Sequence, residues 1–172
     1  MERTALSALA AILGSLSIRW TLIGALAANR YRTAPRLTQD VDLLLADVGP
    51  GLTELIAALT ADGWRVRHRD AAGELIRLVH DQLGTADLLI AGTDYQQEAL
   101  RRARSETLAD GQAVVVLTAE DVIIHKLIAG RSQDIADIEA IVAAEVPLDA
   151  HYLDRWTRFW DVADAWSALR RG

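Results

Sequence analysis

The sequence has no cysteine. Disulfide bridges, thiolate metal sites and cysteine nucleophiles are therefore excluded, which is typical of a cytoplasmic protein. Only 3 of the 172 residues are proline, which leaves little room for a flexible linker and favours one compact domain. No apolar run reaches the ~20 residues that cross a bilayer. The opening stretch, residues 5–16, follows an acidic residue and contains serines, so it predicts a buried helix rather than a signal peptide. We expect a cytoplasmic protein without a membrane partner.

The chain is acidic overall, with a net charge of −6, while hydrophobic residues make up 51% and charged residues 24%. This composition is typical of a folded globular domain. The acidic balance gives no general support for nucleic-acid binding. Positive charge is local, in three clusters: Arg30, Arg32 and Arg36; Arg65, Arg67, His68 and Arg69; and Arg101, Arg102 and Arg104. Each cluster alone is typical of a solvated surface, but three clusters meeting at one cleft would suit a polyanionic substrate.

The spacing of apolar residues predicts strands alternating with helices, followed by a helical tail. Strands are predicted at residues 19–23, 41–46, 64–69, 74–80, 86–91 and 113–117. Helices are predicted at residues 5–13, 24–31, 52–61, 95–104, 119–129, 133–144 and 152–169. The fold class is therefore α/β (α+β), a mixed sheet flanked by helices with a helical C-terminal segment. We expect residues 1–118 to form the core and residues 119–172 to pack on it as one compact unit.

Two aspartates stand at the start of the strand predicted at residues 41–46. Side chains two residues apart on a strand point to the same face, ~6.5–7 Å apart along the chain. Asp40 and Asp42 therefore share one face, and Val41, Leu43 and Leu45 share the opposite, buried face. Partly buried carboxylates repel each other, and a divalent cation relieves that cost. Oxygen ligands favour Mg²⁺, with Mn²⁺ as the alternative. A bare Asp-x-Asp usually just faces water, but here a glycine-containing strand-to-helix turn lies upstream.

A third carboxylate is expected on a neighbouring strand, and Asp87 is well placed at the start of an apolar run. It would complete a metal site with Asp40 and Asp42. Taken alone, Asp87 is interpreted equally well as an aspartate that flanks a turn. Other aspartates that sit nearer turns rank lower: Asp47, Asp81 and Asp94.

Lys126 stands among apolar residues of its predicted helix, where a charge needs a partner or a function. Gly130 is expected to interrupt this helix and Ser132 to cap the next one. Arg131 and Asp134 are then spaced for an ion pair across the break.

Asp137 follows three residues after Asp134, on the same helix face. An ordinary charge pattern on a solvated helix explains Asp137 as well as a functional role does. His125 is expected to cap or pack rather than to bind metal, because no second histidine has ligand spacing. The last predicted helix carries an apolar stripe that favours packing against the core or a second subunit: Trp156, Phe159, Trp160, Ala163 and Trp166.

At these residues the sequence resembles the DNA polymerase β-like nucleotidyltransferase superfamily. More narrowly, it resembles the AbiEii/MenT-type toxin nucleotidyltransferases of prokaryotic toxin–antitoxin and phage-defence systems. The resemblance spans residues 20–138, and the order and spacing of its segments make it specific where each segment alone is weak. The segments are Leu22-Ile23-Gly24-Ala25, Thr38-x-Asp40-x-Asp42, Asp87 in its apolar strand, and a block from Ala119 to Ile138 that includes Lys126, Gly130-Arg131, Asp134 and Asp137.

The resemblance implies that a nucleoside triphosphate, of the ATP or CTP type, lies over the sheet edge. The turn at Gly24-Ala25 would contact its phosphates, and Lys126 would face the triphosphate. Asp87 would also take the proton from the attacking hydroxyl. The implied metal ligands are Asp40, Asp42 and Asp87, and the implied nucleotide-binding residues near Lys126 are Arg131, Asp134 and Asp137. The implied acceptor is RNA, at the 3′ end of tRNA, with growth inhibition as the outcome and an antitoxin protein as partner.

Ala25 departs from the Gly-Gly or Gly-Ser turn of the superfamily. Alanine offers no hydroxyl to a phosphate, so only backbone N–H groups and the helix N-terminus could serve. Two alternatives to an RNA-modifying enzyme therefore stand. The same chemistry could act on a protein or a small molecule, which the acidic net charge favours. A catalytically dead nucleotidyltransferase fold could act as a binding module, which Ala25 favours and the retained aspartates oppose.

Overall fold

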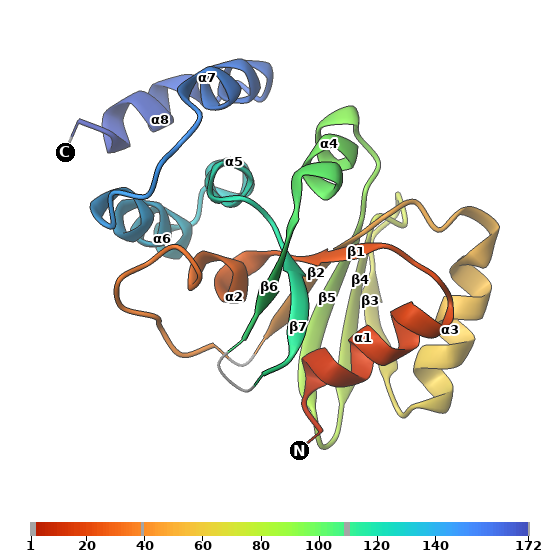
Figure 1. The fold of residues 1–172 in the computed structure, drawn as a ribbon. Coiled ribbons are helices and arrows are strands. Elements are labelled where there is room, and N and C mark those ends of the chain that lie inside the picture. Colours follow the sequence, from red (N-terminus) through yellow and green to blue (C-terminus); the bar gives the residue numbers. More distant parts are fainter. Residues whose placement is uncertain (1–2, 39, 109–110, 172) are drawn as a thin grey trace. The chain divides into compact units, whose positions relative to one another are not determined.

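The computed structural model describes residues 3–38, 40–108 and 111–171. Within these residues the strands form one seven-stranded sheet in the order β3-β4-β5-β2-β1-β7-β6 (Figure 1). The strands are β1 (Trp20–Leu22), β2 (Val41–Leu45), β3 (Arg65–Arg69), β4 (Leu75–His80), β5 (Gly84–Ile90), β6 (Arg104–Thr107) and β7 (Ala113–Val116). The pairs β2–β5 and β1–β7 are parallel and the other neighbours are antiparallel. The predicted mixed sheet is confirmed.

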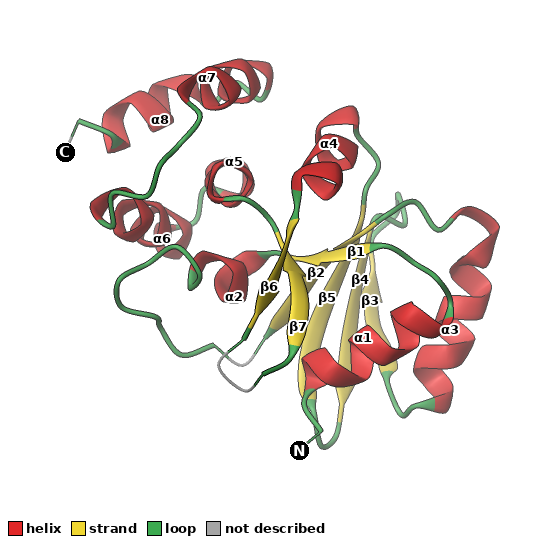
Figure 2. Ribbon diagram, in the orientation of Figure 1, coloured by secondary structure: helices red, strands yellow, loops and turns green. Residues whose placement is uncertain are grey.

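The chain divides into two compact units, residues 1–22 with 39–116 and residues 23–38 with 117–172. Every strand of the sheet lies in the first unit, with helices α1 (Ala5–Ser15), α3 (Leu52–Ala61) and α4 (Asp94–Arg102) and the short 3-10 helix η1 (Gly49–Gly51). The second unit is helical, with α2 (Gly24–Ala28), α5 (Ala119–Ala129), α6 (Ser132–Ala143), α7 (Ala150–Phe159) and α8 (Ala163–Leu169) (Figure 2). The domain boundary at residue 118 stays a prediction.

Alternation along β2 and β5 builds the core of the first unit. Leu43 and Leu45 of β2 and Leu88 of β5 are fully buried, and strand periodicity puts them on one face of the sheet. Helices α1 and α3 pack against each other, and α1 also contacts β5. They contribute Leu9, Leu13, Leu55 and Leu59, which are also buried. Each such side chain stabilises the fold by about 1.5–3 kcal/mol, so this side of the sheet is committed to packing. The opposite side carries both the buried Leu44 and the polar residues at the start of β2.

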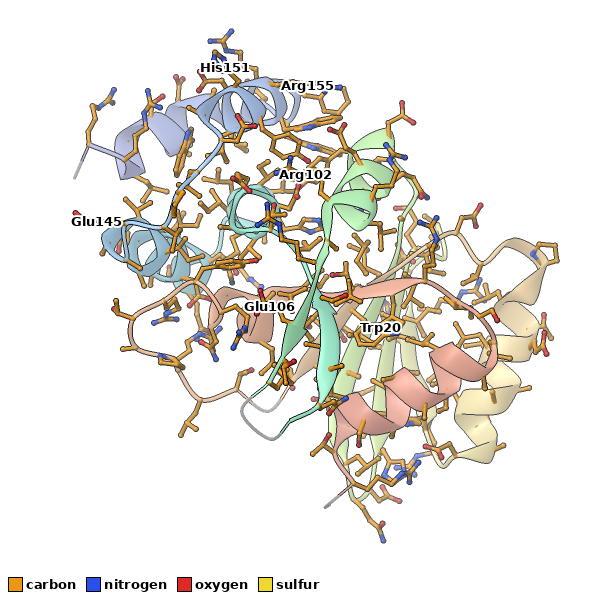
Figure 3. All side chains as sticks on the ribbon, in the orientation of Figure 1. Trp20, Arg102, Glu106, Glu145, His151 and Arg155 are labelled. Carbon is orange, nitrogen blue, oxygen red and sulfur yellow. The ribbon has the colours of Figure 1, made fainter. Side chains whose placement is uncertain are left out.

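The core of the second unit forms around α5, which contacts α2, α6 and α7. Asp121 of α5 is fully buried and accepts hydrogen bonds from the Thr118 hydroxyl at 2.8 Å and the Tyr152 hydroxyl at 2.7 Å. Trp156 of α7 is buried, and the Arg155 guanidinium lies 4.6 Å from the centroid of its ring. His151 and Arg155 are labelled on α7 in Figure 3. Among the residues that the structure describes, no helix is both long and apolar enough to span a membrane.

Two segments differ from the prediction. The sequence predicts a helix as far as Arg104 and no strand between that helix and Ala113, but residues 104–107 form β6, paired with β7. These four residues are all polar, so they lack the apolar alternation that marks a strand. The single helix predicted at 152–169 is instead two helices, α7 and α8, since Asp161 adopts a left-handed φ of 56° between them.

Candidate active site

Asp42 and Asp87 are directly paired across the parallel strands β2 and β5. Paired residues on neighbouring strands point to the same face, with the strands about 4.8 Å apart. Both aspartates are half-buried, and strand periodicity puts them opposite the leucine face described above. Two carboxylates so close repel each other unless a cation neutralises them. Asp87 is therefore not turned to the far side of the sheet from Asp42.

Asp40 lies immediately before β2 and is exposed. It accepts a hydrogen bond from the hydroxyl of Thr85, which stands two residues before Asp87 on β5. The pairing of Asp40 with Thr85 therefore follows the register that pairs Asp42 with Asp87. The carboxylates of Asp40, Asp42 and Asp87 lie on one face of two adjacent strands.

Arg77 on β4 is a site residue that the sequence reasoning missed. It is paired in register with Asp87, and its Nε donates to an Asp87 carboxylate oxygen at 3.2 Å. The alternation along β4 could have assigned Arg77 to one face, but only the antiparallel register shows that this face is the one that holds Asp87. The guanidinium neutralises part of the negative charge at the outer side of the carboxylates.

The donor set of this face fits a hard divalent cation. Carboxylate oxygens are the ligands that Mg²⁺ prefers, and Asp42 and Asp87 stand on adjacent strands in register. Among the described residues, no three acidic or histidine side chains converge on one point as they stand. Thr85 holds one oxygen of Asp40, and Arg77 holds one of Asp87.

The turn at Gly24-Ala25 follows β1 directly, as the sequence predicts. Gly24 has a φ of 64° and opens α2, and Ile23 before it caps the helix without a side-chain hydrogen bond. A positive φ favours glycine because a Cβ would clash with the backbone. Ala25 is buried. The role of this turn in phosphate binding stays a prediction.

Lys126 of α5 is buried in the second unit and bound to two aspartates of α6. Its Nζ lies 3.1 Å from a carboxylate oxygen of Asp134 and 2.6 Å from one of Asp137. The three side chains are 5%, 2% and 1% exposed in the order Lys126, Asp134 and Asp137. Gly130 ends α5 with a left-handed φ of 63°, as predicted. In this structure the ammonium is fully engaged by carboxylates, and the implied contact of Lys126 with a triphosphate stays a prediction.

Arg131 pairs with Asp134 as its spacing predicts, with Nε 2.6 Å from a carboxylate oxygen. Arg131 itself is the N-cap of α6 and Ser132 is the first helical residue, so the predicted capping role of Ser132 is wrong. The backbone N–H of Arg131 donates to the Asp134 carboxylate at 3.3 Å. The Asp134 side chain takes the place of the predicted serine cap, because it accepts a hydrogen bond from the backbone N–H at the start of α6.

Two further arginines reach Asp137, and the sequence reasoning did not connect them to it. Arg32 donates to one carboxylate oxygen, and Arg36 donates to both, at 3.0 and 3.2 Å. Asn29 holds this loop by accepting from the backbone N–H of Arg36 at 3.0 Å and donating to its carbonyl at 2.8 Å. The second unit therefore has a buried network in which positive side chains outnumber the two carboxylates.

The protonation states of this network follow from its contacts. Burial raises the pKa of Asp134, but hydrogen bonds and charge from Arg131 and Lys126 outweigh it, so the pKa is lowered overall. Burial also raises the pKa of Asp137, but hydrogen bonds and charge from Arg36 and Lys126 outweigh it, so this pKa is lowered overall as well. Burial lowers the pKa of His125 to about 4, so this imidazole is neutral at neutral pH and adds no charge for a phosphate.

Comparisons with known proteins find structural likeness only. No family model matches the chain, and no curated protein matches it significantly. The lincosamide antibiotic adenylyltransferase LnuA, bound to lincomycin, has a TM-score of 0.59 at 13% identity over 83% of this chain and 99% of its own. ANT(2'')-Ia, in complex with adenylyl-2''-tobramycin, has a TM-score of 0.62 at 17% identity over 91% of this chain and 94% of its own.

A viral enzyme shares the same architecture. The Megavirus polyadenylate synthase has a TM-score of 0.51 at 12% identity, over 84% of this chain and 33% of its own. All three neighbours are nucleotidyl-transferring enzymes by name, and at these identities the likeness concerns the fold. The chain has a nucleotidyltransferase-like fold, a mixed sheet with flanking helices and a helical C-terminal segment.

Proposed function

We propose that this protein is a Mg²⁺-dependent nucleotidyltransferase that moves a nucleoside monophosphate from a triphosphate to a hydroxyl acceptor. The proposal rests on one observation: Asp42 and Asp87 are paired in register on adjacent parallel strands, on the sheet face opposite Leu43 and Leu88. The fold supports it, since proteins of this fold typically use a divalent metal ion. A binding module would have no need for like charges held side by side.

The proposed reaction is an in-line displacement at the α-phosphate. The acceptor oxygen forms a bond to the α-phosphorus, the bond to the β-phosphate oxygen breaks, and pyrophosphate leaves with that electron pair. Asp87 takes the proton of the attacking hydroxyl. Asp40, Asp42 and Asp87 would hold Mg²⁺, which would supply positive charge to the attacking and leaving oxygens. The proposed nucleotide-binding residues are those of the family resemblance. Gly24 and Ala25 would contact the phosphates and Lys126 would face the triphosphate, with Arg131, Asp134 and Asp137 nearby.

The acceptor and the biological role that we propose come from the resemblance to AbiEii/MenT-type enzymes. On this basis the acceptor is the 3′ end of an RNA, tRNA in particular, and transfer to it inhibits growth until an antitoxin protein binds. The Megavirus polyadenylate synthase supports a polynucleotide acceptor, since its name describes the synthesis of polyadenylate.

A small-molecule acceptor is the second candidate, and the two antibiotic-modifying neighbours favour it, since their structures contain lincomycin or adenylylated tobramycin. Incubation of the purified protein with α-labelled triphosphates and either total RNA or a small-molecule extract separates the candidates. Label in RNA on a gel supports the first, and label confined to small products supports the second.

The decisive variant is Asp42→Ala. We expect it to lower Mg²⁺-dependent label transfer at least ~100-fold, because loss of even the outer partners of a metal ligand costs ~10–100-fold. Asp47→Ala is the matched control, an exposed aspartate just beyond the other end of β2, and it should keep full activity. Full activity in Asp42→Ala would show that the site assignment is wrong. Absence of calorimetric binding of Mg²⁺ and triphosphates by the wild type at millimolar nucleotide would favour the catalytically dead fold.

A further inference from the structure

One row of paired residues crosses the carboxylate face from β2 to the edge of the sheet. Asp42 pairs with Asp87, Asp87 with Arg77, and Arg77 with His68. Since neighbouring strands are about 4.8 Å apart, Arg77 stands about 5 Å and His68 about 10 Å from Asp87. The row therefore begins with carboxylates and ends with basic side chains on β3, an edge strand of the sheet (Figure 2).

A β-bulge adds a second basic residue to the outer end of this row. The register between β3 and β4 shifts between Val66 and His68, so Arg67 and His68 together stand opposite Arg77. Bulges of this kind redirect side chains and are frequent beside active sites. Every residue of β3 is exposed, so this end of the row is open to a partner.

Arg67 and His68 differ in their partners from two other basic residues of β3 and β4. Arg65 is already paired with Asp81, through bonds of 3.0 and 2.6 Å, and Arg77 is paired with Asp87. Within the described part of the chain, Arg67 and His68 have no ion pair. The positive charge of Arg67 is thus uncompensated, although the protein as a whole has a net charge of −6.

We propose that Arg67, His68 and Arg77 bind the phosphates of an RNA acceptor whose terminal hydroxyl lies at Asp87. This inference rests on the proposed function with its RNA acceptor, and adds the surface that binds this acceptor. In an RNA strand, the phosphates nearest the terminal hydroxyl lie at distances from it comparable to those of Arg77 and His68 from Asp87, which are about one and two strand widths. A neutral or cationic acceptor gains nothing from exposed guanidinium groups, whereas a polyanion gains charge-assisted hydrogen bonds.

Edge strands also bear charged residues simply because charge discourages pairing with other chains. That explanation treats all exposed arginines of β3 alike, whereas the acceptor surface involves only one face. Arg69 provides the contrast, since it pairs with Ile76, a buried core residue, and so lies on the opposite face of the same strand.

The test compares Arg67→Glu with Arg69→Glu on the full chain. The probe is a fluorescent single-stranded RNA of about 16 nucleotides with a free 3′ hydroxyl, measured by anisotropy without triphosphate. We expect Arg67→Glu to weaken binding about tenfold or more and to reduce the slope of log affinity against log salt by at least ~0.7, which is one lost phosphate contact. Arg69→Glu should match the wild type. Circular dichroism checks folding, and Arg67→Gln replaces Arg67→Glu if the latter does not fold.

The outcomes separate this inference from the proposed function. Equal losses in Arg67→Glu and Arg69→Glu, or no binding of the RNA probe by the wild type, would overturn the acceptor surface. If Asp42→Ala abolishes label transfer while Arg67→Glu binds RNA normally, the enzyme assignment stands and the surface is wrong. If RNA binding depends on Arg67 but the wild type transfers no label, the surface stands and the enzyme assignment is wrong.

Discussion

At the scale of single residues, Asp137 has the densest set of charged partners in the second unit. Arg32, Arg36 and Lys126 all donate to its carboxylate, and the side chain is 1% exposed. Removing one member of a buried ion pair costs about 3–5 kcal/mol, because the remaining charges lose their partner. We therefore expect Asp137→Ala to lower the free energy of unfolding by about that amount, measured by urea denaturation. Glu139→Ala, an exposed change on the same helix, should leave it unchanged.

The lowered pKa of Asp137 predicts how its contribution to the free energy of unfolding changes with pH. The pKa of Asp137 is lowered in the folded protein, so the folded state binds fewer protons than the unfolded state as acid is added. The contribution of Asp137 is therefore complete above about pH 4, the unfolded value, and is lost as the pH falls below it. On going from neutral pH into this acidic range, the Asp137→Ala variant should therefore lose less free energy of unfolding than the wild type loses. A variant as stable as the wild type at neutral pH would contradict the buried network.

Single residues also show what sequence spacing can and cannot predict. Arg131 and Asp134 are three residues apart, so their ion pair follows from helix geometry alone. Arg36 and Asp137 are 101 residues apart, and no local pattern connects them. Arg77 was missed for a related reason: its contact with Asp87 depends on which residues of β4 and β5 face each other, and register is a property of the folded sheet.

At the scale of elements, strands with apolar alternation could be predicted and polar ones could not. In β2 the buried leucines, with Asp40 before the strand and Asp42 within it, predict both the strand and its faces. The register with β5 agrees with this prediction, since it pairs Asp42 with Asp87. The polar strand β6 has no such pattern, and pairing with β7 alone defines it. The break between α7 and α8 contains neither glycine nor proline, so its left-handed Asp161 gave no signal.

Helix α4 depends on a capping box at its start. The Thr93 side chain accepts from the backbone N–H of Gln96 at 3.2 Å, and the Gln96 side chain accepts from the backbone N–H of Thr93 at 3.1 Å. Loss of such a cap costs about 1 kcal/mol. We expect Thr93→Ala to lower the melting temperature by about 2–4 °C, the shift typical of this cost in a chain of this size, as measured by thermal denaturation.

Helix α3 offers the control for this prediction, because its N-cap residue, Gly51, makes no side-chain hydrogen bond. Thr53 is exposed in the first turn of that helix. Thr53→Ala removes the same atoms without removing a cap, and alanine is the better helix former. Its melting temperature should equal or exceed that of the wild type. A loss as large as that of Thr93→Ala would show that capping is not the cause.

At the scale of the whole molecule, the fold was accessible from the sequence although no family model matches it. The fold is shared at 13% and 17% identity with two enzymes of known structure, because the apolar pattern that builds its core is local in the chain. The acceptor was not accessible in the same way. A fold does not determine which acceptor is used, and under our proposal surface residues of β3 select it.

The folding equilibrium of the entire chain should report on the metal site independently of any acceptor. A ligand that binds only the folded state stabilises it by RT ln(1 + [L]/Kd), about 1.4 kcal/mol at tenfold excess over Kd, or about 3–5 °C in melting temperature. We expect Mg²⁺ to raise the melting temperature of the wild type and of Asp47→Ala by this amount, and not that of Asp42→Ala. With EDTA the order should reverse, Asp42→Ala being at least as stable as the wild type, because one of two adjacent like charges is gone. A Mg²⁺ shift that persists in Asp42→Ala would place the ion elsewhere.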